Sequence, residues 1–155
     1  MGFTLRAALA ELGAGAEIEV AELVPQVVEW AKGPMAELFA DSLLDARVTM
    51  RIADVRSLIV GRKSAYDAIL LDVDNGPEGL SRRANDRLYD GDGLRAARDA
   101  LRPGGVLAVW ASSPNSNFTH RLRRTGFGVE ETRVRASGPG SGSRHTIWLA
   151  TRPPA

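Results

Sequence analysis

Residues 66–77 read Tyr-Asp-Ala-Ile-Leu-Leu-Asp-Val-Asp-Asn-Gly-Pro, in which an apolar run stops abruptly in carboxylates, an amide, a glycine and a proline. A short apolar run with turn residues at its end predicts a strand over Tyr66 to Val73 that is buried on both faces. Such strands occur mainly in parallel sheets that are covered by helices. Ligands bind beyond the carboxyl ends of the strands in these sheets. Asp72, Asp74 and Asn75 therefore occupy the place where an open α/β sheet holds its site.

Predicted strands and helices alternate along the rest of the chain. This alternation indicates an α/β fold with a mostly parallel sheet and right-handed crossovers. No helix is predicted between the last two strands, so we expect them to pair as an antiparallel hairpin. Further strands are predicted over residues 16–22, 47–53, 106–111, 128–135 and 145–150, and helices over residues 5–12, 25–31 with a continuation over 35–39, 94–101 and 113–125.

Three segments are predicted to interrupt these elements. Residues 76–92 are polar and predict a long loop with some helical turns. Pro103-Gly104-Gly105 is expected to end the helix that precedes it. The Ser/Gly/Pro-rich residues 137–143 predict a flexible loop between the last two strands. Because no segment has the composition of a domain linker, residues 1–155 are predicted to form a single domain.

The composition excludes several classes of function. The 155 residues carry a formal net charge of +1, which gives no drive toward nucleic acid or a membrane surface. The chain has no cysteine, which excludes disulfides, cysteine-zinc sites and thiol nucleophiles. His120 and His145 match no metal-binding pattern, so no metal site is predicted. No apolar run approaches the ~20 residues of a membrane span, and a cytoplasmic protein is expected.

Three carboxylates follow three successive predicted strands, namely Glu22, Asp54 and Asp72. In a parallel sheet this spacing predicts that they lie along one edge. An acidic residue at the end of the second strand of a Rossmann unit can accept hydrogen bonds from ribose hydroxyls, and one after the next strand can reach an adenine amino group. The alternative is that each carboxylate is a solvated loop residue or a helix cap.

A glycine precedes the first predicted helix, in the stretch Met1-Gly2-Phe3-Thr4. Rossmann-type sheets have a glycine-rich turn at this point, because a bare backbone lets a ligand approach the helix N-terminus. The first strand of such a sheet is central and comes before this turn. Since no residues before Met1 could form it, the first strand is expected to be missing from this chain.

The order of six short motifs resembles that of spermidine synthase-like proteins, which belong to the S-adenosylmethionine-dependent methyltransferase-like superfamily. The resemblance covers nearly the whole chain. The motifs are residues 1–6, 20–28, 53–55, 66–72, 88–89 and 101–105.

This resemblance implies a Rossmann-like sheet that binds S-adenosylmethionine or its decarboxylated form. Glu22 matches the ribose-binding acid and Asp54 the adenine-binding position. Asp72 matches the aspartate that helps to deprotonate the attacking amine in the synthases, which makes it the candidate catalytic residue. The implied cofactor-binding residues are Gly2, Glu22, Leu23, Asp54, Val55 and Asp72, and the implied substrate-binding residues are Asp74, Asn75 and Tyr89.

The sequence also departs from the synthase pattern. Met1 and Asn75 stand where the synthases carry aspartates, and carboxylates are what an amine cation needs. Tyr89 could contact the substrate; the alternative interpretation is that Tyr89 is buried in the hydrophobic core.

Three functions follow from these observations. The first is binding of S-adenosylmethionine or decarboxylated S-adenosylmethionine, with methyl- or aminopropyl-type transfer to an unknown small acceptor. The second is a non-catalytic module on the same fold that senses a nucleotide or binds a partner. The third, an NAD-dependent oxidoreductase, shares the acidic end of the second strand, but the terminal hairpin argues against it. A small-molecule acceptor is the expected partner, with neither nucleic acid nor membrane, and a homo-oligomer is compatible with the sequence.

Overall fold

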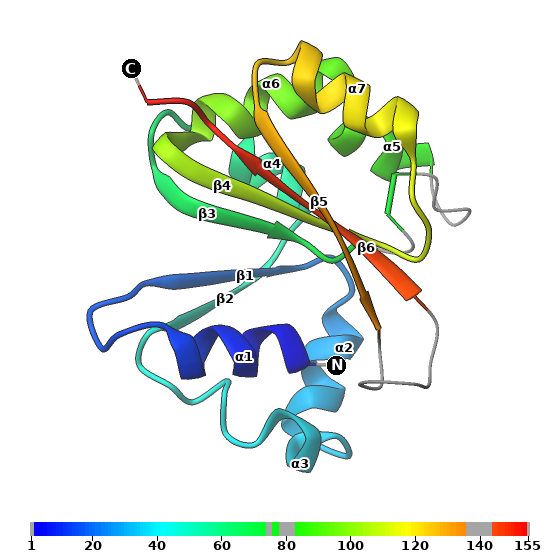
Figure 1. Cartoon of the computed structure of the whole chain (residues 1–155). Helices are drawn as coiled ribbons and strands as arrows, with labels where there is room; N and C mark the ends of the chain where they lie inside the picture. The colour runs from blue at the N-terminus through cyan, green and yellow to red at the C-terminus, as the bar shows by residue number, and fades with distance from the viewer. Residues whose placement is uncertain (1, 74–75, 78–82, 136–143, 155) are drawn as a thin grey trace. The chain divides into compact units, whose positions relative to one another are not determined.

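The computed structural model describes residues 2–73, 76–77, 83–135 and 144–154 (Figure 1). The chain divides into two compact units, residues 1–58 and residues 59–155. The positions of these parts relative to one another are not determined, so each unit is described by itself. The single domain that the sequence predicts stays a prediction.

The first unit is built around two parallel strands. β1 (Ile18–Glu22) pairs with β2 (Val48–Ile52), with Ile18 opposite Val48 and Glu22 opposite Ile52. The helices of this unit are α1 (Phe3–Glu11), α2 (Pro25–Lys32) and α3 (Ala36–Phe39), and α4 (Val55–Ile59) begins at its end. These elements confirm the predicted strands and helices, except that α4 was not predicted. The buried apolar side chains of the first unit include Leu5, Val28, Ala31 and Phe39.

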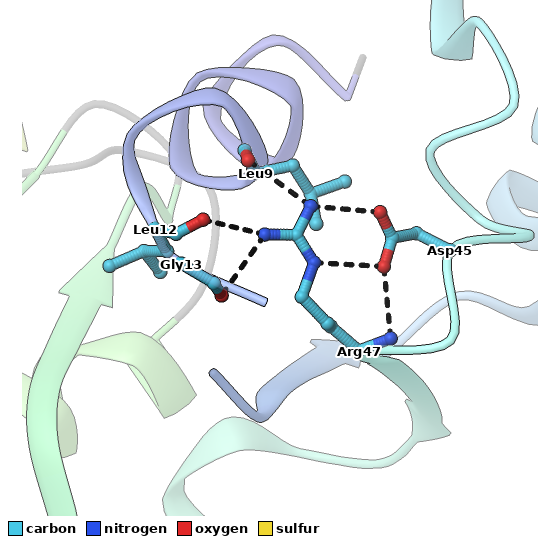
Figure 2. Close-up of polar contacts among 5 residues, drawn as sticks. All are labelled: Leu9, Leu12, Gly13, Asp45 and Arg47. Atoms are coloured by element: carbon cyan, nitrogen blue, oxygen red, sulfur yellow. Dashed lines mark hydrogen bonds and ion pairs between the residues drawn. The ribbon is translucent and has the colours of Figure 1, made fainter. Parts of the chain in front are cut away.

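The side chain of Arg47 joins three parts of the first unit (Figure 2). Its Nε and Nη2 atoms donate to the two carboxylate oxygens of Asp45 at 3.0 and 2.9 Å. Its Nη1 atom donates to the carbonyl oxygens of Leu12 and Gly13 at 2.6 and 3.3 Å, and Nη2 also donates to that of Leu9 at 3.2 Å. Because the last carbonyls of a helix have no partner within the helix, this guanidinium caps the end of α1.

The second unit is a four-stranded sheet in the order β3-β4-β6-β5. β3 and β4 are parallel, whereas β6 is antiparallel to both β4 and β5. The terminal antiparallel hairpin is therefore confirmed. Its strands are β3 (Tyr66–Leu71), β4 (Leu101–Ala111), β5 (Gly128–Arg135) and β6 (Arg144–Thr151), and its helices are α5 (Arg83–Tyr89), α6 (Gly91–Ala100) and α7 (Ser116–Arg124), which gather on one side of the sheet (Figure 1).

Aromatic rings form the centre of the second unit. Phe118 of α7 meets Tyr89 and Trp148 edge-on, at ring-centroid distances of 5.8 and 5.1 Å. The indole Nε1 of Trp148 donates to the hydroxyl of Thr119 at 2.8 Å, so its buried polar atom has a partner. These contacts fix α7 against the sheet and against the end of α5.

The start of β4 differs from the prediction. Leu101 was expected in a helix that Pro103-Gly104-Gly105 would end, but β4 begins at Leu101 and contains these residues. Gly104 has φ 82° and its amide donates to the carbonyl of Arg152 at 2.9 Å, while Arg152 donates back to Gly105 at 2.8 Å. Backbone hydrogen bonds to a residue distant in sequence therefore keep Gly104 and Gly105 in the strand, although both residues favour a turn locally.

The prediction that β3 is buried on both faces is wrong. Ile69 and Leu71 are buried, but Leu70 is 52% exposed and Ala68 is also exposed. Side chains alternate along a strand, and the helices of this unit gather on one side of its sheet. β3 pairs with β4, and within the described residues no strand pairs with its other edge. α5 and the first part of α6 lie within residues 76–92, where the sequence predicts a long loop with some helical turns.

A glycine fixes the turn that follows β3. Gly76 has φ 84°, and its amide donates to the carbonyl of Val73 at 3.3 Å. A Cβ atom on Gly76 would lie 2.5 Å from the Cβ of Ala111 and 2.9 Å from the carbonyl oxygen of Trp110. Gly76 is therefore packed directly against the end of β4.

We predict that acid removes the contribution of the Asp45–Arg47 pair to stability. Hydrogen bonds from Arg47 lower the pKa of Asp45 from 3.8 to about 2. Since the folded pKa is below the unfolded one, the contribution is complete above 3.8 and is lost as pH falls through about 2. Asp45→Asn should lower Tm at neutral pH and reduce the dependence of Tm on pH in the acid range. Glu17→Gln, at an exposed position, is the control; equal acid dependence in Asp45→Asn and wild type contradicts the prediction.

We also predict that Gly76→Ala destabilises the protein more than Gly61→Ala. Both glycines have a positive φ, 84° and 83°, but a Cβ atom on Gly61 would meet nothing within 4 Å. Gly61→Ala should therefore cost only the ~1–2 kcal/mol of the left-handed backbone, whereas Gly76→Ala adds the collision with Ala111. Urea unfolding of both variants measures the difference. Equal losses of unfolding free energy would show that the turn is not packed against β4.

Candidate functional site

Two acidic residues mark the carboxyl ends of the parallel strands in the first unit. Glu22 is the last residue of β1, and Asp54 follows β2 by two positions. The amide of Ala53 donates to the carbonyl of Glu22 at 3.0 Å, which holds the two strand ends together. Glu22 and Asp54 are therefore brought to the same edge, as the sequence predicts for this pair.

Each of these carboxylates uses one oxygen to bind the backbone two residues further on. Oε1 of Glu22 accepts from the amide of Val24 at 2.9 Å, and Oδ1 of Asp54 accepts from the amide of Arg56 at 2.8 Å. The second oxygen of either carboxylate accepts no hydrogen bond from the described part of the chain. Both residues thus make the contacts expected of a turn residue or helix cap, which is the alternative to ligand binding. Each carboxylate still has one oxygen that can accept a hydrogen bond.

Gly2 adopts a conformation that favours glycine. It precedes α1 with φ 72°, and its carbonyl accepts from the amide of Arg6 at 2.9 Å. A Cβ atom on Gly2 would lie 2.6 Å from Cδ1 of Phe39. The expected glycine turn is present, and contact with a ligand there stays a prediction. Of the other two predicted cofactor residues, Leu23 is exposed and Val55 is a half-buried residue at the start of α4.

In the second unit, Asp72 follows β3 directly and is exposed. The next residue, Val73, is held by the hydroxyl of Tyr89, which donates to its carbonyl at 3.3 Å. Asp74 and Asn75 lie outside the described residues. Asp72 and the Glu22–Asp54 pair belong to different units, so the expected row of three carboxylates stays a prediction.

Tyr89 is 1% exposed and packs on Phe118. This placement fits the core tyrosine that the sequence allowed, and contact with a substrate stays a prediction. The carbonyl of Tyr89 also accepts from Nη1 of Arg121 at 2.8 Å. The sequence predicts no role for Arg121 or Gly76 in supporting the end of β3, and the Gly-Pro pair at 76–77 is the one local signal.

The described residues contain neither a metal-binding cluster nor a membrane-spanning helix. No group of three or more histidines, cysteines or acidic residues there could hold a metal ion. No helix in the described ranges is long and apolar enough to cross a membrane.

Comparison with known proteins gives relatives of one kind. No family model matches the chain. The chain is 32% identical over 99 residues to a polyamine aminopropyltransferase of Nitrosomonas europaea, covering 63% of this chain and 28% of that protein. It is 31% identical over 137 residues to the polyamine aminopropyltransferase of Mycobacterium tuberculosis, covering 83% and 25%. The chain thus spans about a quarter to a third of the length of these relatives.

Solved structures share the fold over almost the whole chain. Spermidine synthase from Thermotoga maritima superposes with a TM-score of 0.75 at 20% identity, covering 97% of this chain and 50% of that one. A Burkholderia thailandensis 1,6-didemethyltoxoflavin-N1-methyltransferase, solved with bound S-adenosylhomocysteine, has a TM-score of 0.62 at 19% identity and covers 98% and 67%. The predicted Rossmann-like fold is confirmed, and so is the predicted resemblance: the chain is similar to polyamine aminopropyltransferases over part of their length and shares the fold of spermidine synthase and methyltransferase structures.

Proposed function

We propose that this chain binds S-adenosylmethionine or decarboxylated S-adenosylmethionine and takes part in aminopropyl or methyl transfer to a small acceptor. The observation that carries the proposal is the pair Glu22 and Asp54 at the carboxyl edge of two parallel strands, in a chain whose homologues are aminopropyltransferases. Ligands of open α/β sheets bind at this edge.

The pair fits the adenosine part of either molecule by its donor and acceptor chemistry. Ribose hydroxyls and the adenine amino group are donors, and a carboxylate oxygen is an acceptor. One oxygen of Glu22 and one of Asp54 bind the backbone, so each side chain is already oriented. The other oxygen would accept from ribose in the case of Glu22 and from adenine in the case of Asp54.

Asp72 is the residue that we assign to proton transfer. When bound, the sulfonium compound supplies an electrophilic carbon for an acceptor to attack. An amine acceptor must lose a proton as it attacks, and an exposed carboxylate directly after β3 can take that proton. The bond from Tyr89 to Val73 and the packing of Gly76 against β4 would hold the segment that carries Asp72.

A non-catalytic module on the same fold is the second candidate. The local bonds of Glu22 and Asp54 favour it, because they account for both acids without a ligand. A wild-type chain that binds no adenosine-type ligand would support this second function.

We predict that Glu22→Gln weakens the binding of S-adenosylhomocysteine. Glutamine keeps an oxygen that can accept from the amide of Val24 but removes the charge that strengthens a bond from ribose. Losing a charge-assisted hydrogen bond costs about 1.5–3 kcal/mol, or roughly tenfold or more in Kd. Calorimetry of wild type, Glu22→Gln and the control Glu29→Gln, at an exposed position of α2, measures the change. Unchanged affinity in Glu22→Gln would refute the assignment of Glu22.

We predict that the chain does not make spermidine from putrescine at an ordinary enzymatic rate. Putrescine is a dication, and Asn75 is neutral where the synthases carry an aspartate. One missing charge-assisted contact costs about 1.5–3 kcal/mol, which corresponds to roughly tenfold or more in rate. Asn75→Asp should therefore increase the release of methylthioadenosine from decarboxylated S-adenosylmethionine, and Asp72→Asn should abolish this gain. Ordinary turnover by the wild type would contradict the prediction.

A further inference from the structure

A groove of about 480 Å³ lies between α6 and α7 in the second unit, and the proposed function does not use it. The described residues of its lining carry three guanidinium groups and an imidazole but no carboxylate. The lining residues are Gly91 and Arg95 of α6, Asn117, His120, Arg121 and Arg124 of α7, and Thr125.

Helical spacing places the cationic side chains on facing surfaces. Asn117, Arg121 and Arg124 are four and three residues apart, so they share one face of α7. Gly91 and Arg95 are four apart on α6. α7 contains no acidic residue, and the positive charge of this face is therefore not neutralised within the helix.

Arg121 is held before any ligand arrives. It is half-buried, and its Nη1 atom donates to the carbonyl of Tyr89 at 2.8 Å. A guanidinium has five N–H donors, so this bond fixes the group without exhausting it. A fixed guanidinium loses less conformational entropy when it binds an anion.

The other two guanidinium groups are available to a ligand. Arg95 forms an ion pair with Asp92, but the two side chains are 64% and 77% exposed, and such pairs are weak in water. The side chain of Arg124 is exposed and forms no hydrogen bond or ion pair with any residue that the structure describes. Gly91 has no side chain, and a Cβ atom there would lie 3.3 Å from Nη1 of Arg95.

We propose that this groove binds an oligophosphate, either free or as part of a nucleotide. Planar guanidinium groups match the oxygen pairs of a phosphate, and three of them suit several phosphate charges better than one. The volume lies in the range of sites for small organic molecules. Asp90 and Asp92 are nearby in sequence but are not among the lining residues, and Asp90 accepts from the amide of Gly93.

Calorimetry with sodium tripolyphosphate at fixed ionic strength tests the proposal. Wild type should bind one equivalent saturably, and Arg124→Glu should weaken binding by about tenfold or more, which is ~1.4 kcal/mol. Arg123→Glu is the matched control, since Arg123 is the exposed neighbour of Arg124 on α7 but does not line the groove. It should change the affinity much less. Equal weakening by both substitutions, or the absence of saturable binding, overturns the proposal.

Binding measurements with ATP and citrate identify the kind of ligand, and a measurement on Glu22→Gln distinguishes this site from the proposed cofactor site. ATP that binds more tightly than tripolyphosphate indicates a nucleotide, and equal or weaker binding of ATP indicates a free oligophosphate. Citrate that binds as well as tripolyphosphate overturns the assignment to phosphate. Glu22→Gln should leave tripolyphosphate binding unchanged, so failure at Glu22 and failure at this groove are distinguishable.

Discussion

One guanidinium holds the first unit together. Arg47 binds three carbonyls at the end of α1 and both carboxylate oxygens of Asp45, while its own carbonyl accepts from the amide of Ile18 at 2.8 Å. The residue therefore caps α1 with its side chain and starts the β1–β2 pairing with its backbone. Since the register of β1 on β2 determines which residues end the two strands, the placement of Glu22 beside Asp54 depends on Arg47.

The second unit supports the end of β3 by packing and two hydrogen bonds. Arg121 donates to the carbonyl of Tyr89, and the hydroxyl of Tyr89 donates to that of Val73. Phe118 packs on the ring of Tyr89 from the same helix that carries Arg121. The residue after Asp72 is thus tied to α7, and α7 is also one wall of the cationic groove. A ligand that moves Arg121 would act directly on the support of this segment.

The sequence predicts the local parts of this structure better than the distant ones. The spacing of apolar residues and the turn residues between the apolar segments locate most strands and helices, because these signals act within a few residues. β4 begins earlier than predicted because Gly104 and Gly105 pair with Arg152, nearly fifty residues away. The exposed face of β3 was missed because a short apolar run does not reveal how many faces are covered. The contacts of Arg47 with α1 cross more than thirty residues and have no local signal.

The two interpretations of Glu22 and Asp54 are compatible in physical terms. A carboxylate has two oxygens, and in both residues one of them binds an amide two positions further on. That bond removes rotational freedom from the side chain and leaves the second oxygen as an acceptor. A carboxylate that already makes a cap or turn contact therefore loses less conformational entropy when it accepts a hydrogen bond from a ligand. For the same reason, replacement by alanine would remove the turn and the ligand contact together, whereas an amide of the same shape separates them.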